Sequence, residues 1–275
     1  MTIEQQVAAH YGQKGLEANI LAALTKAGKD VDHLSIDDLS ALDEFHLGWR
    51  DQTARLATDA GFSVGTKVLD VGCGIGGPAR YFADRHQCRV TGLDLTPEFI
   101  SAARMLTQRC GLASKASFEV GSALAMPFAA GSFDAACLIH VGMNISDKPA
   151  LFAEVRRVLR GGGYFAVYDV MVVGDAPLTY PMPWSETPAA SFVASAVAYR
   201  QWLGESGFTM EAEHNRRDQV LEQVKIMRAR AAAEGPPALG LHVIMGPQAK
   251  IRLQNVMAAL EQGHIAPVEM ILRAT

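Results

Sequence analysis

The sequence has few cysteines and no pattern that pairs them. Cys73, Cys88, Cys110 and Cys137 are scattered through 275 residues, without a Cys-x-x-Cys pair or a neighbouring histidine-rich spacing. Neither a disulfide framework nor a zinc site is therefore indicated. No group of His, Asp and Glu has convincing metal-ligand spacing either, so we expect a protein that works without a metal ion.

Long apolar runs and a strong charge of one sign are also lacking. No apolar run approaches the roughly 20 residues of a membrane span, and residues 1–15 lack the basic stretch and apolar block of a secretory signal. The formal net charge of -4 provides no basic field for a phosphate backbone. We expect a cytoplasmic protein that binds neither nucleic acid nor membrane; whether it forms a homodimer stays open.

The residues that are present favour an α/β protein. With 49% hydrophobic and 20% charged residues, the chain has an ordinary globular composition. From Lys67 onward, short β-branched or apolar runs alternate with helical stretches, which predicts βαβ units and a parallel sheet. The expected strands are 67–72, 89–95, 116–121, 133–140 and 164–170, with the glycines 161–163 as the turn before the last of these.

The ends of the chain are expected to be mainly helical. Residues 2–61 predict helices, with an exposed-looking loop at 43–50, DEFHLGWR. Towards the other end we expect a helix at 189–206, a strand at 208–214, helices at 218–234 and 247–262, and a last strand, 266–275, after a proline-containing turn.

A glycine-rich segment, VLDVGCGIGGPARYFA, follows the first expected strand. Gly72, Gly74 and Gly77 fit the fingerprint of a dinucleotide-binding loop. Asp70, two residues before the first glycine, would however repel the pyrophosphate of NAD or FAD. S-adenosylmethionine carries an ammonium and a sulfonium instead, so Asp70 favours this cofactor; the alternative is that Asp70 only helps to cap the following helix.

A second acidic residue, Asp94, ends the next expected strand about 20 residues after the loop. A carboxylate at this place can accept hydrogen bonds from both hydroxyls of a ribose. NAD and S-adenosylmethionine both contain that ribose. Asp94 therefore predicts an adenosine-containing ligand without choosing between them.

Four segments resemble, in order, the motifs of class I, Rossmann-like S-adenosylmethionine-dependent methyltransferases: VLDVGCGIGG, VTGLDLTPEFI, GSALAMPFAAGSFDAACLIHV and EVRRVLRGGGYFAVYDV. The resemblance covers roughly 66–170. It implies a seven-stranded, mostly parallel sheet with an antiparallel last strand. We expect one methyltransferase domain over 1–275, with a helical N-terminal lid (1–61), a cofactor-binding core (62–215), a helical insertion (216–265) and the last strand (266–275).

The resemblance also implies a set of cofactor-binding residues. Asp70, Gly72 and Gly74 would line the methionine end, and the Leu138 carbonyl would accept from the ammonium. Cys73, within the same loop, is a further candidate for cofactor binding. Asp94 would hold the ribose, and Leu95 and the backbone of Ala123 would contact the adenine. Ser122 stands where many members have an acid that binds the adenine amino group, which a hydroxyl does more weakly. Tyr11 and His46, with Arg50, would close over S-adenosylmethionine or its product S-adenosylhomocysteine.

Other segments look like sarcosine/dimethylglycine-type N-methyltransferases, among them DEFHLGWR, HVGMNISDK and PWSETPAASF. We therefore expect a small-molecule acceptor, methylated on nitrogen or oxygen. His140, at the end of the fourth expected strand, is the candidate acceptor-binding residue or general base; the alternative is a histidine satisfied within the strand end.

Trp184 and Met245 are the candidate acceptor-binding side chains, with Met182 and Trp202 as further wall candidates. Trp184 stands in a proline-rich loop that nothing obvious buries, whereas Trp202 lies at helical spacing typical of a core. Two other functions stay open: an NAD(P)-linked oxidoreductase, against which Asp70 argues, and a methyltransferase-like module that binds the cofactor without turnover.

Overall fold

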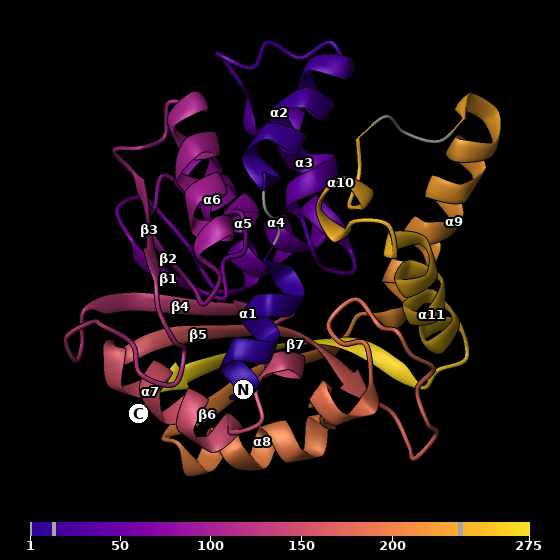
Figure 1. Ribbon diagram of the computed structural model, residues 1–275. Helices are drawn as coiled ribbons and strands as arrows, with labels where there is room; N and C mark the ends of the chain where they lie inside the picture. Colours follow the sequence, from indigo (N-terminus) through magenta and orange to yellow (C-terminus); the bar gives the residue numbers. More distant parts are fainter. Residues whose placement is uncertain (1, 13–14, 236–238) are drawn as a thin grey trace.

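A seven-stranded sheet forms the centre of the molecule. The computed structural model describes residues 2–12, 15–235 and 239–275. The strand order is β3-β2-β1-β4-β5-β7-β6 (Figure 1). The strands are β1 (Lys67–Val71), β2 (Arg89–Asp94), β3 (Ala116–Val120), β4 (Phe133–Ile139), β5 (Leu159–Val172), β6 (Phe208–Asn215) and β7 (Ile265–Ala274).

The pairing within this sheet is parallel except at β7. The pairs β1–β2, β2–β3, β1–β4 and β4–β5 are parallel, and β7 is antiparallel to both of its neighbours, β5 and β6. The expected fold, a mostly parallel seven-stranded methyltransferase sheet with an antiparallel last strand, is confirmed.

Helices cover both faces of the sheet. The α-helices are α1 (Ile3–Tyr11), α2 (Leu16–Lys26), α3 (Ile36–Asp43), α4 (Trp49–Asp59), α5 (Gly77–Arg85), α6 (Pro97–Arg109), α7 (Lys148–Val158), α8 (Ala196–Glu205), α9 (Arg217–Glu234), α10 (His242–Met245) and α11 (Ala249–Glu261). The expected lid and insertion include residues 1, 13, 14 and 236–238, which lie outside the described residues.

The alternation of side chains along β1 shows how the layers form. Leu69 and Val71 pack with α7 on one face of the sheet, whereas Val68 packs with α4 and α5 on the other. Because both faces are covered, the inner strands are apolar nearly throughout. Polar side chains therefore gather mainly at the strand ends, apart from the buried Asp169 within β5 and Glu269 within β7.

The N-terminal helices and the insertion extend the core beyond the sheet. Helices α2, α3 and α10 pack with α6 in one apolar cluster, and α9 and α11 pack in another against the end of β7. Figure 1 shows α9 and α11 side by side at one end of the sheet, with α10 between them and α3. The two helical additions therefore stand on either side of the space above the strand ends.

The helix expected at 189–206 is shorter than the sequence pattern indicates. A 3-10 turn covers Pro188–Ala190, and α8 begins only at Ala196, where the side chain of Ser195 accepts a hydrogen bond from the Ala198 N–H at 3.3 Å. Serine at this position supplies an acceptor that the first helical turn lacks. The cap therefore decides where the helix begins.

The sequence predicts that the glycines 161–163 form a turn before the fifth strand. In the structure they lie within that strand instead. β5 begins at Leu159, directly after α7, and its register against β4 shifts between the Phe133–Leu159 and Ala135–Tyr164 pairs. Only Gly162 has a positive φ, of 72°. The glycines thus permit a bulge inside β5.

The turn directly before β7, residues 262–264, contains no proline, contrary to the expectation, and Pro267 lies inside β7. Its carbonyl accepts a hydrogen bond from the Arg216 N–H at 2.9 Å, just beyond the end of β6. In an antiparallel strand, the N–H and the C=O of one residue point to the same side. The N–H that Pro267 lacks would therefore point to the β6 side, at a level where β6 has already ended. The β5–β7 ladder loses no hydrogen bond.

Candidate functional site

A cavity of about 1330 Å³ opens at the carboxyl ends of the central strands. Gly72 and Gly74 line it after β1, Asp94 and Leu95 at the end of β2, and His140 after β4. In open α/β sheets, ligands bind at this edge. The cavity exceeds the roughly 300–1,000 Å³ of a pocket for one small ligand, so it has room for two.

The glycine loop presents two kinds of glycine. A Cβ on Gly72 (φ 73°) would meet Val141 Cγ2 at 2.4 Å, so the protein itself requires glycine there. A Cβ on Gly74 (φ 53°) would meet no atom within 4 Å, and Gly74 faces the cavity. A ligand in the cavity can therefore approach the backbone of Gly74 closely.

Gly77, at the start of α5, allows a close packing contact with α3. A Cβ on this residue would lie 2.0 Å from the backbone oxygen of Asp43. We expect Gly77→Ala to lower the free energy of unfolding by about 1–3 kcal/mol, the usual cost of overpacking, measured by urea denaturation. Gly161→Ala is the control, because a Cβ there meets nothing within 4 Å. If the two substitutions lower the free energy of unfolding equally, α3 can move away from residue 77 without a measurable cost.

Asp94 joins the glycine loop to the end of β2. Its Oδ2 accepts a hydrogen bond from the Gly74 N–H and its Oδ1 accepts one from the Thr96 N–H, both at 2.9 Å. Burial raises the pKa of Asp94, and these backbone donors counteract that shift. Each carboxylate oxygen retains capacity for a second donor, so Asp94 can hold the loop and a ligand hydroxyl together.

Asp70 lies behind the loop rather than on the cavity wall. Its side chain is 1% exposed; Cys137 Sγ donates to its Oδ1 at 3.4 Å, and its Oδ2 has no hydrogen-bond partner among the described residues. Burial raises the pKa of Asp70 to about 7. A buried carboxylate with an unused oxygen is unusual in a folded protein and is typical of a functional site.

The raised pKa of Asp70 predicts how stability depends on pH. Between 3.8, the ordinary pKa, and about 7, the folded protein holds a proton that the unfolded chain releases, so this carboxyl makes the free energy of unfolding fall as pH rises through that window. We expect Asp70→Asn to remove this decrease. Urea denaturation of both proteins between pH 4 and pH 8 measures it, and parallel pH profiles would contradict it.

The other expected cofactor residues fall into two groups. Tyr11, His46, Leu95 and Ala123 line the cavity, whereas Cys73, Ser122 and Leu138 are not among the residues that line it. Leu138 is fully buried in the core below the strand end. The Ser122 hydroxyl donates to Glu4 of α1 and accepts from the Leu124 N–H at 3.0 Å.

The loop at 43–50, expected to be exposed, is largely buried. Asp43, Glu44 and His46 are each at most 5% exposed. Glu44 accepts hydrogen bonds from His46 Nε2 at 2.9 Å, from Thr53 Oγ1 at 2.7 Å and from Arg50 Nε. Hydrogen bonds from His46 and the Arg50 charge hold the pKa of Glu44 below its ordinary value, against its burial. His46 and Arg50 are therefore anchored within the loop while they line the cavity.

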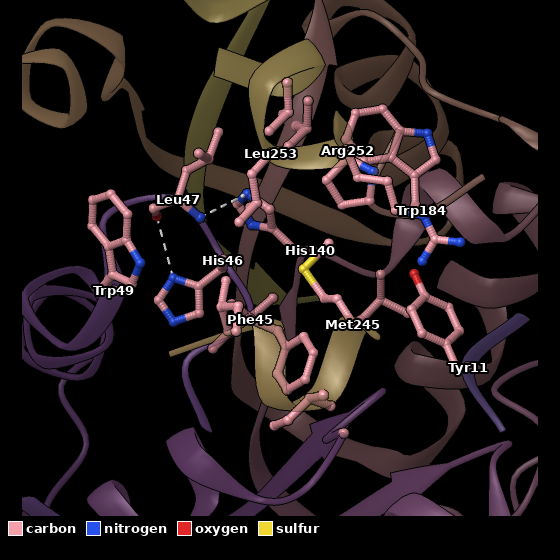
Figure 2. A pocket seen from close by; sticks show the side chains of 18 of the residues that line it. Tyr11, Phe45, His46, Leu47, Trp49, His140, Trp184, Met245, Arg252 and Leu253 are labelled. Atoms are coloured by element: carbon pink, nitrogen blue, oxygen red, sulfur yellow. Dashed lines mark hydrogen bonds between the residues drawn. The ribbon is translucent and has the colours of Figure 1, made fainter. Parts of the chain in front are cut away.

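His140 stands at the centre of the cavity wall with a φ of 54°. The Leu47 N–H donates to its Nε2 at 3.3 Å (Figure 2), and its ring lies 5.8 Å from that of His46 and 5.1 Å from that of Tyr168. Burial lowers the pKa of His140 well below 6.5, so the ring is neutral at neutral pH. Because Nε2 accepts, the proton is on Nδ1. A role as general base requires the Leu47 contact to break.

Trp184 is buried, contrary to the expectation from its loop. It is 5% exposed, its Nε1 donates to Ser191 Oγ at 2.8 Å, and it packs in the cluster of α9 and α11. The insertion supplies the cover that the local sequence could not indicate. Trp184 nevertheless lines the cavity, as does Met245, and Trp202 packs against the main core as expected.

Several cavity residues lie outside the sequence prediction. Asn144 contacts the Tyr11 hydroxyl at 3.4 Å, and Phe45, Trp49 and Arg252 also line the wall (Figure 2). Trp49 has a φ of 45°, which is rare for a residue other than glycine and typical of constrained sites. Phe45 and Trp49 belong with His46 to the segment DEFHLGWR, so the sequence already pointed to the part of the chain that holds them. No feature of the sequence marks Arg252 as a cavity residue.

Two absences concern the same described part of the chain. Within residues 2–12, 15–235 and 239–275, no group of three or more His, Cys, Asp or Glu side chains is arranged to hold a metal ion. Over these ranges no helix is both long and apolar enough to cross a membrane.

Comparison with known proteins identifies the central segment. Residues 69–167 match the family model described as a methyltransferase domain. The chain carries a class I methyltransferase domain. The matched segment begins in β1 and ends in β5, so the methyltransferase domain contains the glycine loop, Asp94 and His140.

Similar proteins extend this finding. Sterol 24-C-methyltransferase ERG6B of Gibberella zeae is 40% identical over 114 residues, which cover 42% of this chain and 30% of that protein. The chain spans about a third to a half of the length of the curated relatives it matches. Their similarity therefore bears on the methyltransferase domain rather than on the helical additions.

Solved structures share the fold over nearly the whole chain. Geranyl diphosphate C-methyltransferase from Streptomyces coelicolor A3(2) has a TM-score of 0.70 at 14% identity and covers 100% of this chain and 99% of that one. A sarcosine dimethylglycine methyltransferase from Galdieria sulphuraria, described as putative, has a TM-score of 0.64 at 19% identity, with 93% and 97% covered. At identities of 14% and 19%, the similarity shows a shared fold. Because nearly the whole chain is covered, that fold includes the helical additions around the methyltransferase domain.

Proposed function

We propose that the protein transfers a methyl group from S-adenosylmethionine to a small-molecule acceptor. The observation that carries this proposal is the arrangement of Gly74 and Asp94. Open backbone and a partly buried carboxylate face one cavity at the carboxyl edge of the sheet, within a methyltransferase domain. Similar proteins named for methyl transfer to sterols, phosphoethanolamine and alkaloids support a small-molecule acceptor.

The residues present fit this cofactor better than a dinucleotide. Asp70 leaves one carboxylate oxygen without a partner among the described residues, directly behind the glycine loop. A cationic amino-acid group stabilises such a carboxylate, whereas a pyrophosphate would be repelled by it. Asp70 would therefore attract the methionine end, Asp94 would hold the ribose, and Leu95 and Ala123 would contact the adenine.

S-adenosylmethionine supplies an activated methyl group on its sulfonium. The chain's part is to bind, orient and dehydrate. Tyr11 and the loop at 43–50 cover the cavity from the N-terminal side, and α9 to α11 cover it from the other. His140, neutral and held by Leu47, would position the acceptor rather than remove its proton. Trp184 and Met245 would contact the acceptor.

Methylation of nitrogen or oxygen, a cytoplasmic location and catalysis without a metal ion remain part of the proposal. The formal net charge of -4 supports a small-molecule partner rather than a nucleic acid. We expect methyl transfer to persist undiminished in excess EDTA. Loss of activity that Mg²⁺ restores would contradict this part alone.

The decisive experiment is calorimetric titration with S-adenosylmethionine, S-adenosylhomocysteine and NAD. We expect saturable binding of the two sulfur ligands and none of NAD. Binding of NAD instead would establish the oxidoreductase alternative. If both sulfur ligands bind, transfer of a radiolabelled methyl group to a panel of small acceptors separates an enzyme from a module that only binds the cofactor.

A further inference from the structure

The half of the cavity away from the glycine loop is apolar. It is lined by side chains from the cluster that joins the β5 end, the loop around Trp184 and helices α9 and α11: Leu47, Met143, Val170, Trp184, Val224 and Val256. Further methionines, Met245 and Met257, also line the cavity. Such a wall suits an acceptor with an extended apolar body.

One cationic side chain reaches into this apolar half. Arg252 on α11 lines the cavity, and its side chain is 11% exposed. Its Nη2 donates to Glu186, while its Nε is shielded and has no hydrogen-bond partner among the described residues. Figure 2 shows Arg252 on the same side of the cavity as Trp184 and Tyr11. Glu186 itself is 45% exposed and also lies 3.9 Å from His10.

The other charged residues near this half are exposed: Asp51 accepts a hydrogen bond from Gln223 at 2.9 Å, and two arginines form surface pairs. Arg230 pairs with Glu234 at 2.8 Å and Arg228 with Glu261 at 2.7 Å, and all four side chains are well exposed. Burial lowers the pKa of His10, which disfavours a second charge beside Arg252. Among the described lining residues of this half we find no buried carboxylate. The buried charge of this half is therefore the Arg252 guanidinium, and its partner Glu186 is half exposed.

We infer that the acceptor carries an anionic group, a carboxylate or a phosphate, which binds Arg252, and that an apolar body extends from it along the wall. The reachable donor of Arg252 is Nη1, which is not enclosed by protein and donates no hydrogen bond to the described residues. Such a guanidinium donor in an apolar cavity gains most from an anionic oxygen. A cationic amine would instead be repelled by Arg252. This inference rests on the proposed function, because it assigns the acceptor's chemistry, and it makes simple cationic amines that lack an anionic group poor acceptors.

Binding of four probes with one apolar chain tests the inference: decanoate, decyl phosphate, decanol and decylamine. Calorimetry with the S-adenosylhomocysteine-saturated protein is expected to show at least one anionic probe binding about tenfold tighter than decanol, the worth of one charge-assisted hydrogen bond. The carboxylate and phosphate arms show which anion the site prefers. Arg252→Gln is expected to abolish the preference and leave decanol binding unchanged.

Two further variants make the result specific. Glu186→Gln removes the carboxylate that competes for Arg252 and is expected to tighten anion binding several-fold, without touching the core. Arg200→Gln is the matched control, since Arg200 is another helix-borne arginine, paired with Glu213 at 2.7 Å outside the cavity; it is expected to change nothing.

The outcomes separate the inference from the proposed function. Equal binding of anionic and neutral probes, absence of binding by both anionic probes, or a preference that survives in Arg252→Gln overturns the inference. Weaker S-adenosylhomocysteine binding in Arg252→Gln with an intact anion preference would assign Arg252 to the cofactor's carboxylate and overturn it too. If S-adenosylhomocysteine does not bind wild type, the proposed function fails, and the same titrations without it still test the anion site.

Discussion

Replacing Asp94 with alanine is expected to weaken S-adenosylmethionine binding about a hundredfold or more. The substitution removes the carboxylate and with it the proposed hydrogen bonds to two ribose hydroxyls. Each such bond to a charged acceptor is worth about 1.5–3 kcal/mol, and about 1.4 kcal/mol corresponds to tenfold in affinity. The substitution would also remove the acceptor of the Gly74 N–H, which donates to the Asp94 carboxylate at 2.9 Å in the wild type. Calorimetric titration of wild type and variant measures the difference.

Asp134→Ala is the matched control for Asp94. The Asp134 carboxylate also accepts a backbone hydrogen bond, from the Lys67 N–H at 2.9 Å, but at the opposite edge of the sheet, away from the cavity. Its removal is expected to leave cofactor affinity unchanged. Asp94→Asn, which keeps one acceptor oxygen, should fall between. Equal affinities of Asp94→Ala and wild type, with both proteins folded, would remove Asp94 from the cofactor site.

The sequence was sufficient to predict the positions of the glycine loop, of most strands and of Asp94 at the end of β2, because these depend on local spacing. A strand, a turn that needs positive φ and a carboxylate at the next strand end lie within about 25 residues, so chain geometry brings them together without knowledge of the rest. The lengths of the helices followed less well. Ser195, which sets the start of α8, is a short polar residue like many others in the sequence.

Burial of Trp184 and of the loop at 43–50 could not be predicted in the same way. Trp184 is covered by helices that follow it by more than 30 residues, and Asp43 is paired with Arg80 from a different helix. Polar residues in a row usually indicate exposure; here they satisfy one another inside the protein. Arg252 shows the same limit, since on a helix of mixed character nothing marks its arginine as pointing inward.

The Arg80–Asp43 ion pair is expected to be the most sensitive buried contact around the glycine loop. Both side chains are fully buried, with Nη2 and Oδ2 2.9 Å apart. Burial raises the pKa of Asp43, which Arg80 counteracts. We expect Arg80→Leu to lower the free energy of unfolding by about 3–5 kcal/mol, because it leaves a buried carboxylate without its main partner. Urea denaturation at neutral pH measures the change.

The same helix provides a control that differs mainly in burial. Arg85 on α5 pairs with Asp37 of α3 at the same 2.9 Å, but the two side chains are 48% and 68% exposed. Arg85→Leu is expected to cost at most about 1 kcal/mol. Because the Asp43 carbonyl packs directly on Gly77, Arg80→Leu should also weaken cofactor binding, whereas Arg85→Leu should not. If both variants lose equal stability, burial is not what makes the Arg80 pair matter; if Arg80→Leu unfolds more easily yet binds the cofactor normally, the pair stabilises the fold without shaping the loop.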